Sequence, residues 1–184
     1  MKKNDLAMVA SILTFWFEET TQKQKYSKDD VFDVRIRETY EETYWKIMSG
    51  ETESWRETAN GRLAEIVVLD QFARNMFRDD AQSFAGDALA LWLAQEAVAV
   101  EADAEVSEEQ KQYFYMPFMH SESKEVHEEA LRIFTERGGA KMLEYEIKHK
   151  KIIDRFGRYP HRNVALGRES TPEEIEFLKE RTGF

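Results

Sequence analysis

Apolar residues recur along this chain at intervals of three and four positions, which is the period of an α-helix and not of a β-strand. Residues that interrupt helices are sparse, because the 184 positions hold three prolines and eight glycines. The pattern therefore predicts an all-α fold of about eight to nine helices, packed as antiparallel pairs in a compact bundle or short solenoid. No linker or low-complexity tract divides the series, so we expect residues 1–184 to form a single all-helical domain.

Capping residues predict where helices of the first half begin and end. Ser27, followed three positions later by Asp30, is typical of a helix start, and the apolar stripe after it stops near Gly50. A polar connector then leads into two further helices at about 62–77 and 81–100.

The second half of the chain carries capping signals of the same kind. Ser107 and Gln110 form a capping box that starts a helix. Pro117 is expected to end that helix at Met116, because a residue before proline is pushed out of the α region. Residues 117–123, PFMHSES, are thus interpreted as a break between helices. Later boundaries are expected at Gly157, Thr171, Pro172 and Glu174.

Composition narrows the classes of function. The chain has no cysteine, which removes disulfides, thiolate metal sites and thiol nucleophiles. Its net charge of −10 argues against binding to a nucleic-acid backbone, and no apolar run approaches the roughly 20 residues of a membrane span. Charged residues interrupt the apolar N-terminal stretch and no cleavage site follows, so we interpret it as a mature helix. We expect a cytoplasmic protein with no nucleic-acid or membrane partner, and its oligomeric state stays open.

The apolar pattern breaks in the segment LDQFARN, residues 69–75. Helical geometry continues the core stripe of the preceding turns into Asp70 and Arg74, which are spaced as an i, i+4 ion pair. A second polar row beside this pair consists of Gln71, Asn75 and Arg78. A buried lone charge costs several kcal/mol, so these residues are either satisfied structural groups or part of a site.

Polar residues also gather in the break expected after Pro117. An imidazole at His120 close to the carboxylate of Glu122 suits acid–base chemistry near neutral pH, and it is also an ordinary way to satisfy loop backbone groups. No G-x-S-x-G elbow surrounds Ser121, so the segment does not favour a serine hydrolase.

Metal and cofactor sites find little support in the sequence. The H-E-x-x-H motif is absent, and its spacing is lacking among the available nitrogen and oxygen ligands: His120, Glu122, His127, His149 and His161. The glycines match neither the G-x-x-x-x-G-K-[ST] nor the G-x-G-x-x-G spacing of phosphate-binding loops. We therefore expect no metal and no cofactor.

The segment RFGRYPHRNVALGR, residues 155–168, concentrates positive charge and contains no acid. Its arginines provide planar donor forks that suit a carboxylate or a phosphate. Its polar residues are Arg155, Arg158, His161, Arg162, Asn163 and Arg168. Two interpretations stay open: the arginines clamp an external anion, or they latch the C-terminal segment onto the bundle by pairing with carboxylates such as Asp70 and Glu122.

Four segments together resemble the bacterial domain-of-unknown-function family 924: ILTFWF, LDQFARNMFR, FYMPFMHSES and RFGRYPHRNVALGRESTPEE. The similarity extends from about Leu13 to Phe184, and FGR-x-PHRN-x-x-LGR is its highly specific part. The resemblance implies an all-helical, tetratricopeptide-like right-handed superhelix with a concave face, and no established activity. It places the family's polar motif on Asp70, Gln71, Arg74, Asn75, Arg78, His120, Ser121, Glu122, Arg155, Arg158, His161, Arg162, Asn163 and Arg168.

The chain departs from the family pattern at two positions. Ala73 stands where the resemblance leads us to expect a proline, so no proline kink is expected in that helix. His127 stands where we expect a glutamine, so the resemblance assigns it no role.

Three hypotheses about function follow. In the first, the three polar segments meet and bind a small acidic ligand or a peptide carboxylate through an Arg/His/Asn cluster. The cluster would comprise Arg74, Asn75, Arg78, His120, Arg155, Arg158, His161, Arg162, Asn163 and Arg168. In the second, the protein is an enzyme that applies acid–base chemistry to an anionic substrate, with the candidates His120, Glu122, His161 and Asp70. In the third, it is a protein-interaction scaffold whose polar motifs are purely structural.

Overall fold

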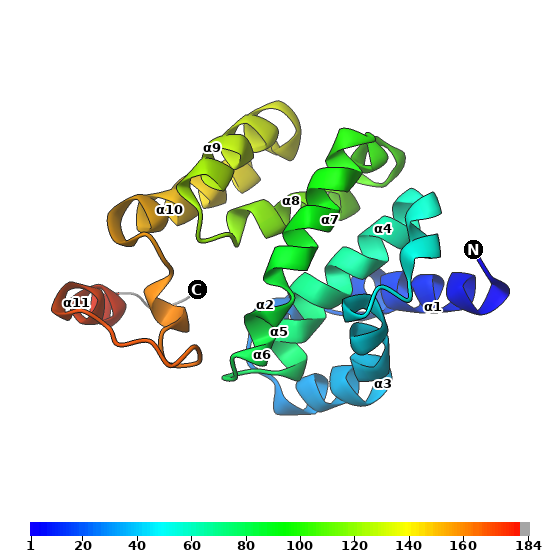
Figure 1. Ribbon diagram of the computed structural model, residues 1–184, viewed down its shortest axis with the longest axis horizontal. Coiled ribbons are helices and arrows are strands. Elements are labelled where there is room, and N and C mark those ends of the chain that lie inside the picture. The colour runs from blue at the N-terminus through cyan, green and yellow to red at the C-terminus, as the bar shows by residue number, and fades with distance from the viewer. Residues whose placement is uncertain (181–184) are drawn as a thin grey trace. The chain divides into compact units, whose positions relative to one another are not determined.

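The computed structural model describes residues 1–180, and every regular element among them is a helix (Figure 1). This confirms the predicted all-α class. The described chain divides into two compact units, residues 1–78 with 82–117, and residues 79–81 with 118–180. No helix within residues 1–180 is both long and apolar enough to cross a membrane. The single domain and the superhelical arrangement stay predictions, and each unit is described by itself.

The first unit is built from α-helices joined by tighter and wider helical turns. Its elements are α1 (Lys3–Thr14), a π-helical turn (Phe15–Glu19), α2 (Gln22–Tyr26), α3 (Asp30–Met48), a 3₁₀ turn (Glu53–Glu57), α4 (Ala59–Ile66), a π-helical turn (Val67–Phe72), α5 (Ala73–Met76), α6 (Gln82–Ala85), α7 (Asp87–Ala99), a 3₁₀ turn (Ala102–Glu105) and α8 (Glu108–Met119), which belongs to this unit up to Pro117.

Aromatic side chains form the core of the first unit. The ring centroid of Phe72 lies 5.7 Å from that of Phe15, 5.4 Å from Trp16 and 4.8 Å from Tyr40, and all four residues are buried. Tilted and edge-to-face pairs of this kind stabilise a core by more than their buried area alone. The apolar stripes of α1, α3 and the α4–α5 segment thus meet at one place.

The predicted start of the long helix α3 is wrong by two residues. Ser27 ends α2, a short helix that the sequence analysis did not predict, and its backbone N–H donates to the carbonyl of Lys23 at 2.9 Å. The N-cap is Asp29, whose Oδ1 accepts from the backbone N–H of Phe32 at 3.1 Å. Gly50 follows the last turn with φ of +79°, as predicted for a helix stop.

The helix predicted at 62–77 begins earlier, at Ala59, and contains a π-helical turn at Val67–Phe72. The turn is closed by the backbone N–H of Ala73, which donates to the carbonyl of Val68. A proline at position 73 could not make this hydrogen bond, because proline has no N–H. Turns of this kind are rare and frequently occur at functional sites.

The predicted break at Met116 is also wrong, because α8 continues through Pro117 to Met119. A proline inside a helix costs about 3 kcal/mol through its missing N–H and its clash with the preceding turn. Here the flanking residues Phe114, Tyr115 and Phe118 are fully buried, and burying one such aromatic ring is worth a similar amount. The break between helices occurs three residues later than predicted, at 120–123.

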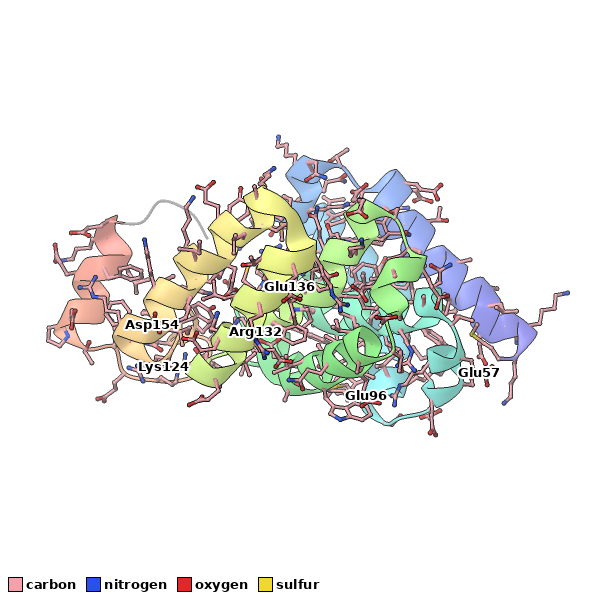
Figure 2. The ribbon with its side chains drawn as sticks, turned by 90° about the horizontal axis from the view of Figure 1, so that it is seen from above. Glu57, Glu96, Lys124, Arg132, Glu136 and Asp154 are labelled. Atoms are coloured by element: carbon pink, nitrogen blue, oxygen red, sulfur yellow. The ribbon has the colours of Figure 1, made fainter. Side chains whose placement is uncertain are left out.

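The second unit contains α9 (Lys124–Ile133), a π-helical turn (Phe134–Gly138), α10 (Gly139–Phe156), a 3₁₀ turn (Pro160–Arg162) and α11 (Pro172–Glu180). Helices α9 and α10 lie side by side (Figure 1). The labels in Figure 2 show Lys124 of α9 next to Asp154 of α10, where Lys124 Nζ donates to the backbone carbonyl of Asp154 at 3.2 Å.

Two helix boundaries predicted in this unit are confirmed, the end of α10 and the start of α11. Gly157 ends α10 with φ of +70°, the left-handed conformation that glycine adopts without strain. Thr171 and Glu174 start α11 with a reciprocal capping box: Thr171 N–H donates to Glu174 Oε2 at 2.8 Å, and Glu174 N–H donates to Thr171 Oγ1 at 3.2 Å.

The inward-facing ion pair predicted on the α4–α5 segment is present. Asp70 is only 1% exposed, and its Oδ1 lies 3.3 Å from Nη1 of Arg74. The same guanidinium donates to Oδ2 of Asp87 on α7 at 3.2 Å, and Gln71 Nε2 donates to Asp70 Oδ2 at 2.5 Å. The pair therefore links α5 to α7 at the edge of the core.

Replacing Asp70 with alanine is expected to destabilise the protein by about 3 kcal/mol or more, because the change removes one partner of a buried ion pair. Glu38→Ala, which removes an exposed carboxylate from α3, is the control and should change the free energy of unfolding little. Urea unfolding curves of the two variants measure both values. Similar midpoints for the two variants would contradict the buried role of Asp70.

Candidate functional site

The predicted ligand-binding residues of the first unit contact protein carboxylates. Asn75 Nδ2 donates to Asp33 Oδ1 at 2.8 Å, and Arg78 donates to both oxygens of Asp33 at 2.6 and 3.0 Å. Together with Arg74, which contacts Asp70 and Asp87, these side chains join α5 to α3 and α7. The polar rows of this helix therefore have structural partners within their own unit.

In the second unit, Glu122 connects the break after α8 with the arginine-rich segment. Its Oε2 accepts from Arg168 Nη1 at 2.7 Å, and its Oε1 accepts from Arg168 Nη2 at 3.0 Å and from the backbone N–H of Tyr159 at 2.7 Å. Burial raises the pKa of Glu122, but the hydrogen bonds and the charge of Arg168 outweigh burial and bring this pKa below its ordinary value. Glu122 is therefore held as a carboxylate in a two-pronged ion pair.

A second ion pair joins the arginine-rich segment to α11. Arg158 donates to the two oxygens of buried Glu174 at 2.7 and 2.9 Å, and Asn163 Nδ2 also donates to this carboxylate at 3.3 Å. The hydrogen bond from Arg158 is the main reason that the pKa of Glu174 is lowered to about 2. The sequence analysis recognised Glu174 only as a cap, because its ion pair needs the folded loop.

The remaining two arginines of this segment also contact protein groups. Arg162 Nη2 donates to the backbone carbonyl of His120 at 2.9 Å, and its guanidinium lies 4.8 Å from the ring centroid of Tyr159. Arg155 pairs with Glu173 at 2.7 Å on the surface. The latch interpretation thus accounts for Arg158 and Arg168, which each meet a carboxylate with two hydrogen bonds.

Three of the chain's four histidines lie around the buried ring of Tyr159 in the second unit, and the fourth lies beside one of them. The ring centroid of Tyr159 is 5.5 Å from that of His161, 5.9 Å from His149 and 6.4 Å from His127. His120 continues the cluster, with its ring centroid 6.4 Å from that of His149. We call these five residues the histidine cluster.

One member of the histidine cluster, His127, forms a fully buried pair with Glu146 of α10. His127 Nδ1 lies 2.7 Å from Glu146 Oε1, and His127 Nε2 lies 2.9 Å from the carbonyl oxygen of Ser121 and 3.2 Å from the hydroxyl of Tyr159. Because a carbonyl only accepts, Nε2 carries a hydrogen. The contact with Glu146 then needs a second proton, either on Nδ1 or on the carboxyl group.

The pKa of Glu146 is consistent with a His127–Glu146 pair that retains this second proton. Burial raises the pKa of Glu146, and the hydrogen bond and charge of His127 only partly oppose this effect. Its other oxygen, Oε2, has no hydrogen-bond partner within the part of the chain that the structure describes. The pair is electrically neutral in either proton arrangement, which lowers the cost of burying it.

A second member, His149, is held as a neutral imidazole. Burial lowers the pKa of His149 to about 3, and the other histidines add to this effect, while a hydrogen bond to the carbonyl of Tyr145 opposes it. That bond, 2.8 Å long, uses Nδ1, so Nδ1 is the donor and Nε2 is an acceptor. His120 and His149 are partly exposed, and His161 is exposed.

The sequence analysis assigned no site role to three members of the cluster, His127, His149 and Tyr159, or to Glu146, the partner of His127. Glu146 and His149 have an E-x-x-H spacing on α10, which was an available signal. Within residues 1–180, however, no group of three or more His, Asp or Glu side chains is placed to hold a metal ion. Tyr159 gave no signal beyond its position in the family motif.

The predicted site residues are divided between the two units. His120, Glu122 and the polar residues of 155–168 come together in the second unit through the contacts given above. Asp70, Arg74, Asn75 and Arg78 lie in the first unit. That all three polar segments meet stays a prediction.

Comparisons with known proteins support the family resemblance. The family model described as "Bacterial protein of unknown function (DUF924)" matches residues 12–182. A solved structure, that of the protein of unknown function ATU0120 from Agrobacterium tumefaciens, is 36% identical and has a TM-score of 0.89. The match covers 96% of this chain and 99% of that chain. No curated protein matches the chain.

The latch at Glu174 predicts a pH dependence of stability. Its pKa of about 2 in the folded protein is below the ordinary value of 4.5, so folding favours the carboxylate. The stabilisation is complete above pH 4.5 and is lost as pH falls toward 2. Urea unfolding at several pH values should show a steeper loss in this window for the natural protein than for Glu174→Gln. Parallel curves would contradict the latch.

The His127–Glu146 pair predicts unequal effects of removing its two members. His127→Ala leaves a buried carboxyl group without its partner and should cost about 3 kcal/mol or more. Glu146→Gln keeps a hydrogen-bond partner for Nδ1 of His127, because an amide both donates and accepts, and should cost about 1 kcal/mol. Glu144→Ala, an exposed change on the same helix, is the control. Equal losses for His127→Ala and Glu146→Gln in urea unfolding near neutral pH would contradict the importance of the hydrogen bond between the two side chains.

Proposed function

Because this chain belongs to the bacterial DUF924 family of unknown function, we propose its function from geometry: the histidine cluster of the second unit binds a small molecule that carries a carboxylate. The observation that carries the proposal is the gathering of all four histidines in one cluster, three of them around the ring of Tyr159 and His120 beside His149. Side chains 41 positions apart, such as His120 and His161, contribute to one cluster.

The chemistry of the cluster suits such a ligand. Binding sites for small molecules combine an apolar or aromatic wall with a few directed polar groups. The buried ring of Tyr159 forms the base of the cluster, and the partly exposed imidazoles of His120 and His149 and the exposed His161 provide directed donors and acceptors. The guanidinium of Arg162 against the tyrosine ring adds a positive charge, which favours an anion.

This proposal changes the roles that the sequence gave to the arginines. Arg158 and Arg168 are assigned to positioning, because each already holds a protein carboxylate through two hydrogen bonds. Glu122 accepts from the backbone N–H of Tyr159, and Arg168 donates to the carbonyl of Tyr159 at 3.3 Å, so this ion pair holds the backbone of Tyr159. The ligand contacts are assigned to His120 and His161, and buried Arg162 contributes its positive charge from behind them.

Binding is favoured over acid–base catalysis because the candidate carboxylates are sequestered. Asp70 is buried in an ion pair, and Glu122 is held by Arg168 with its pKa below the ordinary value. The His127–Glu146 pair has fully buried side chains. A general base must reach the proton that it removes, directly or through one water. The scaffold hypothesis accounts for the arginines but gives no reason for the histidines to gather.

The proposal predicts that a small carboxylate stabilises the folded protein by mass action. A ligand present at a hundred times its Kd adds about 2.7 kcal/mol, which corresponds to a rise in Tm of several degrees for a chain of this size. We expect citrate or succinate to raise the Tm above the value in sodium chloride of equal ionic strength. His161→Gln should remove most of this shift.

Arg155→Gln is the matched control, because it removes a positive charge from the same segment but from a surface ion pair. It should keep the citrate-dependent shift. A shift that is the same in all three proteins would show a general salt effect, and no shift in the natural protein would contradict the binding function.

A further inference from the structure

The ammonium group of Lys25 in the first unit lies among three aromatic rings. Its Nζ is 5.2 Å from the ring centroid of Phe17, 5.3 Å from that of Trp16 and 5.7 Å from that of Tyr113. These distances fall within the range of cation–π attraction. The Lys25 side chain is 1% exposed, so the rings and the surrounding protein enclose it.

The core holds these rings in place. Trp16 and Tyr113 are buried, with their rings edge to face at 86° and a centroid distance of 6.2 Å. Phe17 meets the ring of Tyr113 at 89° and 5.0 Å. The π-helical turn Phe15–Glu19 supplies two of the walls, and α8 supplies the third. We call Trp16, Phe17 and Tyr113 the aromatic cage.

The helix that carries Lys25 is short and lies at the surface, and its Tyr26 also forms a hydrogen bond with Tyr113 of the cage. Helix α2 has five residues, none of which is buried as a whole. Its capping box is internal, between Thr21 and Gln24. The ion-pair partner of Lys25 is Glu109, at 3.5 Å, and the Glu109 side chain is 54% exposed. Burial lowers the pKa of Lys25, and Glu109 only partly opposes this effect.

From this geometry we propose that the aromatic cage is a binding site for a compact organic cation, a methylated ammonium group, and that Lys25 is its internal occupant. Aromatic cages recognise methylated ammonium groups because these cations lose less hydration than a primary ammonium and keep the attraction to the rings. Displacing Lys25 would release its side chain to water and loosen α2, which would then be held mainly by Tyr26. The cage belongs to the first unit, so this site does not depend on the carboxylate-binding function of the second.

Chemical rescue tests the proposal. Lys25→Ala empties the cage and is expected to lower the Tm. Tetramethylammonium chloride should raise the Tm of this variant by several degrees more than sodium chloride of equal ionic strength, because it fills the cage in the folded state only. Lys23→Ala, which removes an exposed lysine from the same helix, should respond equally to the two salts.

A second variant tests whether the cage itself is responsible. Phe17→Leu in the Lys25→Ala protein removes one ring and keeps an apolar side chain, so it should abolish the specific effect of tetramethylammonium. The proposal is overturned if Lys25→Ala responds equally to the two salts, or if the specific effect persists without Phe17.

Limited trypsin digestion of the natural protein gives a measurement that does not need the Lys25→Ala variant to fold. Tetramethylammonium should accelerate cleavage after Lys23 and Lys25, because displacement of Lys25 loosens α2. Cleavage after exposed Lys179 in the second unit is the internal reference. Unchanged relative cleavage at α2 would overturn the displacement of Lys25.

Discussion

Buried carboxylates that each require a cation are the constraint on which this helical protein depends. A carboxylate without a partner in a protein interior costs several kcal/mol, so its cation must arrive when the chain folds. The arginine pairs of this kind are Arg56 with Glu65, Arg74 with Asp70, and Arg158 with Glu174. Each ion pair joins a residue of one helical segment to a neighbouring turn or helix. The pairs therefore fix which segments are in contact, which the apolar stripes alone do not determine.

This constraint explains why an acidic protein concentrates arginine in residues 155–168. Two carboxylates, Glu122 and Glu174, approach this segment from the break after α8 and from α11, and two arginines meet them. The resulting frame holds the backbone of Tyr159, which also donates its hydroxyl to the carbonyl of Met119 at 2.5 Å. The arginines therefore position Tyr159, and in the function that we propose the histidines beside it contact the ligand.

The aromatic cage differs from the arginine latches in a way that bears on function. Removing Arg158 would strand the buried carboxylate of Glu174, so this latch is costly to open. Removing Lys25 strands no buried carboxylate, because its ion-pair partner Glu109 is mostly exposed. A cation held mainly by rings can be exchanged for another cation, whereas a buried ion pair cannot exchange one partner at low cost. Replacing the bound cation is therefore expected to cost less free energy at Lys25 of α2 than at Arg158, which holds α11.

The sequence by itself determined the helical class and those boundaries that depend on local capping hydrogen bonds or on a glycine's backbone conformation. The Ser107–Gln110 capping box and the left-handed Gly157 are examples, since both are local and need no distant partner. Only the tertiary structure decided that α8 continues through Pro117, because burial of flanking aromatic residues compensates for the lost hydrogen bond. It also decided the gathering of the histidines, which lie up to 41 positions apart in sequence. Helical period and capping act over a few residues, whereas burial and charge pairing depend on which distant segments the fold brings together.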